Sequence, residues 1–463
     1  MFDIRVKNFR KFKDEKFRFK KFNMLYGVNS GGKSSVLKLL LALKESIDQS
    51  NWENNITFNS SLTGLSSFSE VVRNNDRNAN IEIDISIGRK DFLPFFKKET
   101  KEMDLASVSK QAVVKTNHNT SIKYVFSREV GNPGSFNVVI KNKGIGELFI
   151  QPMNHADIIS YDGINRNEKC IVVFKRRDGT QIRVGEFDYR RKAFLVMLSA
   201  YELEKSLNKR DTTPEKSGGV EYIFAEIAYL LISQNYLEDE LLPKISLINT
   251  TGVNPKRHYS TLDRSVRSID NVRDISGMVS HLNSLSKDFQ VIVMKDLSRL
   301  LRQFEVCDKV DVNNHTKLHV SEITVTHKKV KRNLVDVGLG TAHLILMLYK
   351  INFLTKADKA MTLLIMEPES HIFPKLQSKF VEYLIKCAQN TNHAFIIESH
   401  SEYIMEKFQS EVKNKNVNTN DFSSYFFDGD YISEHFIDKA GMINPPFPSG
   451  LFDTSSDLLR DLF

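Results

Sequence analysis

The sequence predicts an α/β fold in which a parallel sheet is interrupted by an antiparallel β-rich subdomain and a helical insertion. Two apolar runs of strand length, Phe22–Tyr26 and Met361–Met366, are each followed by a loop and a helical pattern. Between them, residues 80–188 hold short β-type runs broken by Gly, Pro and Asp turns, and residues 190–305 show a helical period. With 463 residues, 41% of them hydrophobic, the chain can form two or three domains with real cores.

The order of these patterns divides the chain into five expected segments. Residues 1–75 would form the first half of the α/β lobe, and residues 76–188 the β-rich subdomain. Residues 189–317 would form the helical insertion, residues 318–425 the second half of the lobe, and residues 426–463 a C-terminal tail. The insertion would therefore separate two halves of one domain.

Residues 27–35 read Gly-Val-Asn-Ser-Gly-Gly-Lys-Ser-Ser, a complete phosphate-binding loop between the first apolar run and an amphipathic helix. The glycines allow backbone N–H groups to close around phosphate oxygens, and the helix N-terminus favours the anion. Lys33 would reach the outer phosphates, and the Ser34 hydroxyl would bind magnesium. The loop predicts binding of a nucleoside triphosphate through Asn29, Ser30, Gly31, Gly32, Lys33, Ser34 and Ser35.

Three further motifs follow in the second half of the chain. A turn containing Gly338 and Gly340 precedes an apolar helix, so backbone N–H groups again point out of a helix N-terminus. The apolar run 361–366 ends in Glu367-Pro-Glu369, with a His-x-x-Pro sequence after it. The run 394–397 is followed by Glu-Ser-His-Ser, which places His400 at the tip of a strand.

The order of these motifs resembles that of the ABC-type ATPases of the SMC, RecF and OLD (overcoming-lysogenization-defect) group. The resemblance covers residues 1–75 and 318–425, and the insertion matches only loosely. The ending Gly441-Met-Ile-Asn-Pro-Pro-Phe-Pro-Ser-Gly-Leu-Phe-Asp453 is similar to the tail of an uncharacterised bacterial branch of AAA family ATPases in that group. The resemblance implies an ABC-type P-loop ATPase head that uses ATP and Mg²⁺.

The resemblance also implies a homodimer or higher homo-oligomer in which two heads sandwich two ATP molecules. The turn at Gly338 and Gly340 would then contact the γ-phosphate bound to the opposite subunit. Glu367 would polarise the attacking water, and His400 would contact the γ-phosphate or that water. Hydrolysis would need two chains.

One position departs from the pattern of the group. An aspartate that holds magnesium usually precedes the catalytic glutamate, but Met366 stands there, and a thioether is a poor ligand for a hard cation. Either Ser34, phosphates and water hold the metal alone, or Glu367 takes the metal role and Glu369 polarises water. The departure at Met366 favours slow hydrolysis, which would suit a switch better than a motor.

The formal net charge is +8, and the basic residues cluster. The clusters lie at Arg5–Lys21, Lys256–His258, Arg264–Arg267 and Lys328–Arg332. Such patches attract a phosphate backbone without reading its sequence, so a nucleic acid is a candidate ligand. The same basic residues could instead lie on solvent-exposed faces of strands and helices, or bind an acidic partner protein.

Several functional classes are disfavoured. The N-terminus lacks the apolar core of a signal peptide and no later run has the length of a membrane span, so we expect a cytoplasmic protein without membrane contact. The segment after Ser401 is too short for the Toprim nuclease domain of OLD nucleases, and the insertion lacks the heptads of SMC arms. The sequence of the glycine turn differs from the LSGGQ signature of transporters.

The sequence therefore predicts an ATPase that dimerises on ATP and controls a nucleic-acid-related response. We expect it to act in bacterial defence against phage with a separately encoded effector, a nuclease or a toxin. The alternatives are a nucleotide-gated scaffold or sensor, and a RecF-like DNA-repair ATPase.

Overall fold

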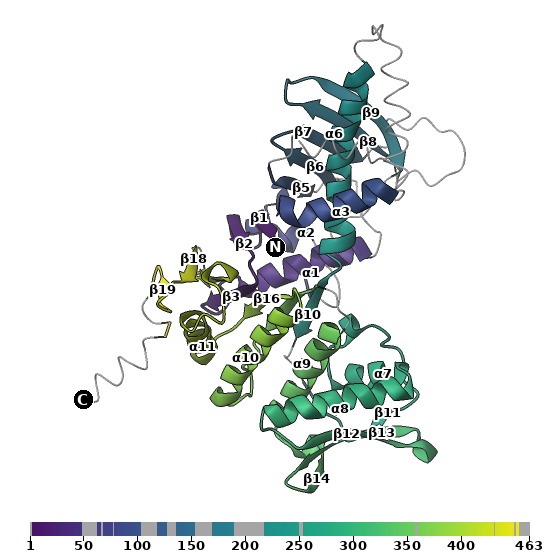
Figure 1. Ribbon diagram of the computed structural model, residues 1–463, viewed down its shortest axis with the longest axis vertical. Coiled ribbons are helices and arrows are strands. Elements are labelled where there is room, and N and C mark those ends of the chain that lie inside the picture. Colours follow the sequence, from purple (N-terminus) through teal and green to yellow (C-terminus); the bar gives the residue numbers. More distant parts are fainter. Residues whose placement is uncertain are drawn as a thin grey trace, which may run out of the picture. The chain divides into compact units, whose positions relative to one another are not determined.

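The computed structural model describes residues 2–48, 63–65, 68–76, 78–102, 118–126, 136–152, 169–188, 217–249, 253–356, 360–429, 431–448 and 451–452 (Figure 1). The chain forms two compact units. The first consists of Met1–Phe19 and Ser35–Pro243, and the second of Lys20–Ser34 and Lys244–Phe463. Among the described residues, no helix has both the length and the apolar character needed to cross a membrane.

The first unit contains an eight-stranded antiparallel sheet in the order β2-β1-β4-β5-β6-β7-β8-β9. Strands β4 and β5 bury every second residue, which is the pattern of a sheet with one face on the core. The expected antiparallel subdomain is confirmed. The strands are β1 (Phe2–Phe9), β2 (Phe12–Arg18), β4 (Ile81–Ile87), β5 (Thr120–Phe126), β6 (Phe136–Asn142), β7 (Gly146–Pro152), β8 (Lys169–Arg176) and β9 (Gln181–Asp188).

Helices cover this sheet. Helix α6 packs against β5, β6 and β7 and against α3, as Figure 1 shows. Phe92 and Phe96 of α3 pack edge-on or tilted against Tyr229 of α6, at ring-centroid distances of 5.0 and 4.9 Å. The helices among the described residues of this unit are α1 (Lys33–Asp48), which begins in the second unit, α2 (Phe68–Val71), α3 (Arg89–Glu102) and α6 (Ser217–Asn235), with the short turn η2 (Arg73–Asn75) and the π-helix η6 (Tyr236–Leu241).

The second unit contains a seven-stranded sheet in the order β10-β15-β16-β3-β17-β18-β19. Strands β10, β15, β16, β3 and β17 are parallel, and β18 and β19 add an antiparallel edge. Strands β3 and β17 are buried at every position, as expected for parallel strands covered on both faces. The strands are β3 (Phe22–Gly27), β10 (Ile245–Asn249), β15 (Thr362–Met366), β16 (Ala394–Glu398), β17 (Phe422–Phe427), β18 (Ile432–Ile437) and β19 (Ile443–Asn444).

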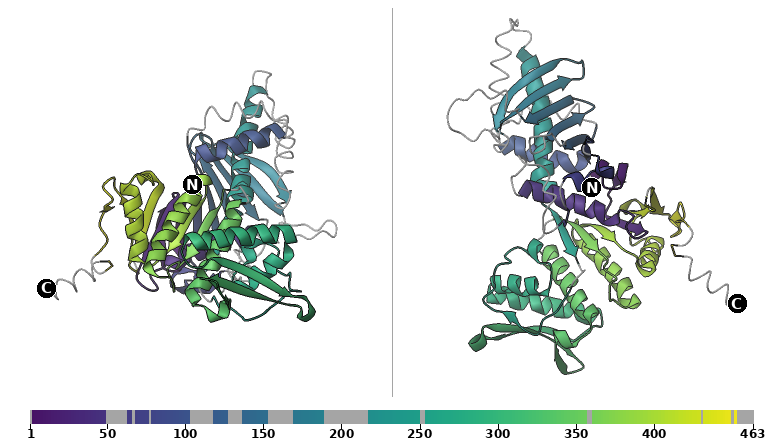
Figure 2. Two further views of the ribbon diagram at one scale, coloured as in Figure 1. Left: turned by 60° about the horizontal axis from the view of Figure 1, so that its bottom comes forward. Right: turned by 180° about the vertical axis from the view of Figure 1, so that it is seen from behind.

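A second, four-stranded sheet lies in the same unit, with β14 paired to β13. Helix α8 packs on β12 and on α9, as both views in Figure 2 show. The strands are β11 (Tyr259–Ser260), β12 (Lys309–His315), β13 (Val320–His327) and β14 (Val330–Asn333). The helices of this unit are α7 (Ile275–Ser284), α8 (Lys287–Gln303), α9 (Leu339–Lys356), α10 (Pro374–Asn390) and α11 (Glu402–Lys413), with short turns η7 (Ile269–Asn271), η8 (Thr316–Leu318), η9 (Leu334–Asp336) and η10 (Thr419–Asp421).

The structure confirms a mixed α/β fold but differs from three of the expected segment boundaries. Strands β1 and β2 belong to the antiparallel sheet and not to the parallel lobe. The range 189–317 is not purely helical, because it contains β11, β12 and β10, which pairs with β15. The expected tail contains the end of β17 and strands β18 and β19 of the sheet. Strand β10 has the sequence Ile-Ser-Leu-Ile-Asn, and five residues are too few to show a period that separates a strand from a helical turn, so β10 was missed.

Candidate nucleotide-binding site

The phosphate loop follows β3 and is fixed against the end of β17. A Cβ atom added to Gly27 would lie 2.1 Å from the Phe427 carbonyl oxygen, and one added to Gly31 would lie 2.9 Å from the same atom. The Val28 N–H donates to that carbonyl at 3.0 Å. Gly27 and Gly32 have φ angles of 135° and 114°, which a side chain would strain. Larger residues at these positions would therefore disturb the packing of the loop against β17, in addition to blocking the approach of a phosphate group to the loop backbone.

Lys33 and Ser34 begin α1 directly after this loop. Lys33 is 4% exposed, and its ammonium donates to the Gly27 and Val28 carbonyl oxygens at 2.8 and 2.9 Å. Burial lowers the pKa of Lys33, while the charges of Glu398, Glu367 and Glu369 oppose that shift. The ammonium thus lies beside carboxylates of two other strand ends.

The hydroxyls of Ser34 and Ser35 have different partners. Ser34 Oγ donates to Glu398 Oε1 at 2.6 Å, so it faces the end of β16. Ser35 Oγ accepts from the Arg10 guanidinium at 3.2 Å, and its expected nucleotide contact stays a prediction. Asn29 and Ser30 are exposed in the loop, and Ser30 has a φ angle of 60°.

Glu367 follows the last residue of β15 in a strained backbone conformation. Its φ angle is 45°, a left-handed value that residues other than glycine seldom adopt, and its N–H donates to the Glu398 carbonyl at 2.8 Å. The Ser370 hydroxyl approaches Glu367 Oε2 at 3.4 Å. Strain of this kind is concentrated at functional sites, where the surrounding structure holds one side chain in place.

Glu369 is tied to the end of β16. Its Oε2 accepts from Ser399 Oγ at 3.0 Å, and its Oε1 accepts a short hydrogen bond from the His400 backbone N–H. Burial raises the pKa of Glu369, the bonds from His400 and Ser399 oppose that shift, and the charge of Glu367 adds to it. Glu369 therefore positions the segment that carries His400, whereas Glu367 lies at the strand tip.

His400 projects at the same edge of the sheet and is exposed. Partial burial of the ring lowers its pKa first, the charge of Lys33 lowers it further, and the charge of Glu367 opposes both. The next residue, Ser401, caps α11 by accepting from the Ile404 N–H at 3.2 Å and donates to Gln377 of α10. The imidazole thus stands on a turn that neighbouring helices hold in place.

The turn at Gly338 and Gly340 gives its two glycines different environments. A Cβ atom on Gly340 would lie 2.1 Å from the His371 carbonyl oxygen of the loop after β15, so this glycine has a packing role within the chain. Nothing lies within 4 Å of a Cβ atom added to Gly338, which is exposed before the first residue of α9. The predicted phosphate contacts of both residues stay predictions.

Sequence reasoning missed Glu398. Glu398 pairs in register with Met366 on the neighbouring strand, and the only signal in the sequence was a carboxylate at the end of an apolar run. No group of three or more His, Cys, Asp and Glu side chains that could hold a metal occurs among the described residues. For a magnesium ion bound with a nucleotide, the Ser34 hydroxyl, a neighbouring carboxylate and the phosphates would form a ligand set that suits this ion.

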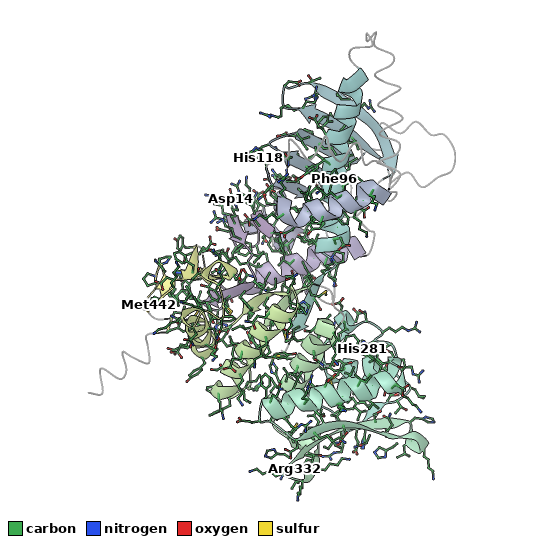
Figure 3. All side chains as sticks on the ribbon, in the orientation of Figure 1. Asp14, Phe96, His118, His281, Arg332 and Met442 are labelled. Atoms are coloured by element: carbon green, nitrogen blue, oxygen red, sulfur yellow. The ribbon has the colours of Figure 1, made fainter. Side chains whose placement is uncertain are left out.

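The basic cluster of residues 328–332 lies on the β13–β14 hairpin of the small sheet, and the clusters at 256–258 and 264–267 precede and follow its strand β11. Strand β11 pairs with β13, β13 pairs with β14, and the Asn333 amide donates to the Arg257 carbonyl at 3.1 Å. Arg257 itself forms a bidentate pair with Asp336 at 3.1 and 2.6 Å. Arg332, labelled in Figure 3, lies on β14.

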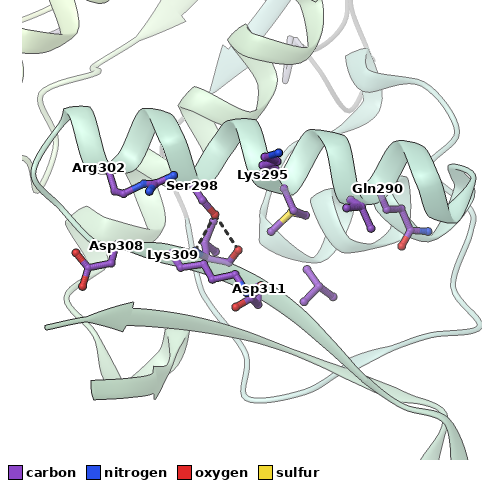
Figure 4. Close-up of a pocket in the computed structure, with 11 residues that line it drawn as sticks. Gln290, Lys295, Ser298, Arg302, Asp308, Lys309 and Asp311 are labelled. Atoms are coloured by element: carbon purple, nitrogen blue, oxygen red, sulfur yellow. Dashed lines mark hydrogen bonds and ion pairs between the residues drawn. The ribbon is translucent and has the colours of Figure 1, made fainter. Parts of the chain in front are cut away.

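Two hollows border this sheet. One, of about 360 Å³, is lined by His327, Lys328, Arg332 and Thr341, so the basic hairpin reaches the glycine turn. The other, of about 540 Å³, lies between α8 and β12 and has lining residues of both charges (Figure 4). There Ser298 Oγ bridges the Val310 N–H and carbonyl at 3.1 Å each.

A family model described as AAA ATPase domain matches residues 1–148 and 201–405, well over half of the chain. The chain belongs to this AAA ATPase family. The match includes the phosphate loop, the glycine turn, Glu367 and His400. An ATPase of this family uses a nucleotide and usually Mg²⁺.

Solved structures of SMC head domains are also similar to this AAA ATPase. The Smc head of Pyrococcus furiosus, bound to the C-terminal domain of ScpA, matches with a TM-score of 0.41 and 10% identity over 100% of both chains. An SmcHead bound to the C-winged helix domain of ScpA matches with a TM-score of 0.42 and 10% identity over 95% of this chain and 98% of that one. The SMC head domain from Thermotoga maritima matches with a TM-score of 0.35 and 10% identity over 94% of this chain and 98% of that one. A search of curated proteins gave no match.

Proposed function

We propose that this chain hydrolyses ATP at the phosphate loop, with Glu367 and His400 as catalytic residues. The observation that carries the proposal is the meeting of three chain segments at one edge of one sheet. Lys33 follows β3, Glu367 follows β15, and His400 follows β16, and these strands are parallel neighbours in the order β15-β16-β3. Ligands of α/β sheets bind at this carboxyl edge of the strands.

Each residue has a chemical task at that edge. Lys33 neutralises charge on the outer phosphates, and magnesium, when bound with the nucleotide, withdraws charge from them. Glu367 orients and polarises the attacking water, while Glu369 holds the His400 segment through the bonds to Ser399 and the His400 N–H. Because the pKa of His400 is lowered, its imidazole is neutral near pH 7 and can hydrogen-bond the water or the γ-phosphate.

A second copy of the chain would complete the site. The turn before α9 is exposed, with Val335 at 37% and Leu339 at 46% exposure, and the hollow lined by Lys328 and Arg332 adjoins it. A helix N-terminus beside cationic side chains favours an anion, and the exposed apolar residues favour contact with protein. These features support an ATP-bound homodimer in which Gly338 faces the nucleotide of the opposite subunit.

A nucleotide-gated switch with slow turnover is the second candidate. Met366 favours it, because the strand that leads to Glu367 ends without a carboxylate for magnesium. In this form ATP binding holds the dimer and hydrolysis only resets it. Control of a nucleic-acid-related response in phage defence, with a separate nuclease or toxin, stays our prediction from the sequence.

Phosphate release and light scattering test the proposal together. We expect the full chain to release phosphate from ATP in the presence of Mg²⁺ and to shift from monomer to dimer with ATP but not with ADP. Dimer formation with fewer than about one turnover per minute would favour the switch over the enzyme. Absence of both ATP binding and phosphate release would contradict both candidates.

A further inference from the structure

The hydroxyl that would bind magnesium faces a carboxylate that the phosphate-loop motif does not include. Ser34 Oγ lies 2.6 Å from Glu398 Oε1, although the two residues are far apart in the chain. Glu398 is the last residue of β16, the strand that directly neighbours β3. A side chain in contact with the Ser34 hydroxyl is adjacent to whatever that hydroxyl binds.

Glu398 is deeply buried for an acidic residue. It is 3% exposed. Of the three carboxylates whose negative charge raises the pKa of Lys33, Glu398 has the largest effect. A buried carboxylate is costly unless hydrogen bonds and cations compensate it. The Ser34 hydroxyl and the Lys33 ammonium supply part of that compensation, and a divalent cation at Ser34 would supply more.

The neighbouring strand end carries a residue that cannot bind magnesium well. Met366 and Glu398 are partners in the parallel register of β15 and β16, so the two positions lie side by side at the sheet edge. Magnesium prefers oxygen ligands, and the thioether of Met366 offers none. The carboxylate of Glu398 therefore lies at the end of β16, one strand closer to the phosphate loop than position 366 at the end of β15, where the magnesium-binding aspartate is expected.

The other two carboxylates of the edge have different contacts. Glu369 accepts from Ser399 and from the His400 N–H, which ties both of its oxygens to the end of β16. Glu367 is approached by the Ser370 hydroxyl of its own loop. Glu398, in contrast, contacts the predicted magnesium ligand directly.

We infer that Glu398, together with Ser34 and the nucleotide phosphates, binds the magnesium ion that accompanies ATP, and that it replaces the carboxylate missing at Met366. This inference rests on the proposed function, since it assigns a ligand within the same site. It resolves the ambiguity at the end of β15, because Glu367 is then not needed as a metal ligand and can act on water.

The test is the effect of magnesium on the affinity for a fluorescent ATP analogue, measured by anisotropy with the full chain in Mg²⁺ and in EDTA. Glu398→Gln keeps the size of the side chain and a hydrogen-bonding oxygen but removes the charge. We expect it to weaken binding in Mg²⁺ by about 10- to 100-fold, the usual loss for an altered metal site, and to leave binding in EDTA within about threefold of the original chain.

Two further variants sharpen the result. Met366→Asp in the Glu398→Gln background restores a carboxylate at the paired position and should regain most of the magnesium effect. Glu411→Gln is the matched control, because Glu411 is also a buried carboxylate of this unit but bonds Lys407 and Asn416 in α11 and the turn after it. It should leave the magnesium effect unchanged.

The outcomes separate the two proposals. If the original chain binds the analogue in neither condition, the proposed function fails before Glu398 is examined. If the original chain shows the magnesium effect and Glu398→Gln retains it in full, the assignment of Glu398 is wrong and the proposed function stands. Should Glu398→Gln fail to fold, Glu398→Met removes the carboxylate and keeps a side chain of similar length, and an unchanged magnesium effect in that variant would overturn the assignment.

Discussion

The phosphate loop and the turn at Gly338 and Gly340 both lead into helices, but they differ in how closely other residues of the chain enclose them. At the phosphate loop, Gly27 and Gly31 pack on Phe427, Lys33 is buried, and carboxylates of two neighbouring strands lie nearby. At the second turn, Gly338 is exposed with open space around it. We therefore expect the enclosed turn to bind a ligand by itself, and the exposed turn to bind one together with a second surface.

Replacement of Lys33 by alanine should have the largest effect, because it removes the cation from the enclosed turn. We expect loss of ATP binding and of phosphate release, since the outer phosphates then lack their charge-assisted hydrogen bonds. Titration with a fluorescent ATP analogue measures this. An unchanged affinity would show that the enclosed turn does not bind the triphosphate.

Glu367→Gln should slow hydrolysis by about 10²- to 10⁴-fold and leave ATP binding intact, because the amide keeps the shape of the side chain but no longer polarises water. Light scattering should show a persistent ATP-bound dimer. Glu369→Gln is the comparison, and we expect it to reduce turnover less, through disorder at His400. If Glu369→Gln alone stops turnover, the roles of the two carboxylates are exchanged.

A bulky residue at Gly338 tests whether the exposed turn acts across a dimer. Gly338→Trp should abolish turnover while ATP binding to the monomer and the melting temperature change little, because the side chain points into open space within one chain. Mixed with Lys33→Ala, it should regain turnover at one of two composite sites. Full turnover by Gly338→Trp alone would show that each chain hydrolyses ATP by itself.

Alanine at the two glycines of this turn separates packing from ligand contact. Gly340→Ala should destabilise the chain by about 1–3 kcal/mol, because the new methyl group overlaps the His371 carbonyl, a backbone atom that cannot rotate away. Gly338→Ala is its matched control and should change the free energy of unfolding by about 0.5 kcal/mol or less. Urea denaturation compares them, and equal losses would contradict the difference in environment.

Charge reversal on the basic hairpin should have the smallest effect on the site. Replacing Lys328, Lys331 and Arg332 by glutamate should leave ATP binding intact, because these side chains lie on the small sheet. If they contact a nucleic acid, the variant should bind it more weakly and with a flatter salt dependence. Anisotropy with labelled duplex and single strands at two salt concentrations measures this. No binding by the original chain at low salt would make an acidic partner protein the better hypothesis.

The sequence by itself determined the features whose spacing is local. The phosphate loop needs its glycines, Lys33 and Ser34 within a few residues, so its chemistry is visible without any contact between distant segments. The same holds for the alternation in β4 and β5, because side chains of a strand alternate between faces. The order of Glu367 and His400 along the chain was enough to place both at strand tips.

Only the tertiary structure decided which distant residues meet. The contact between Ser34 and Glu398 depends on β16 lying between β15 and β3, and the contact of Gly340 with His371 depends on how α9 packs on the loop after β15. Likewise, β10 joined the parallel sheet and β1 and β2 joined the antiparallel one. Strand neighbours and their register are set by the packing of the whole sheet, and no local pattern encodes the partner, which is why the carboxylate beside the phosphate loop became visible only in the folded chain.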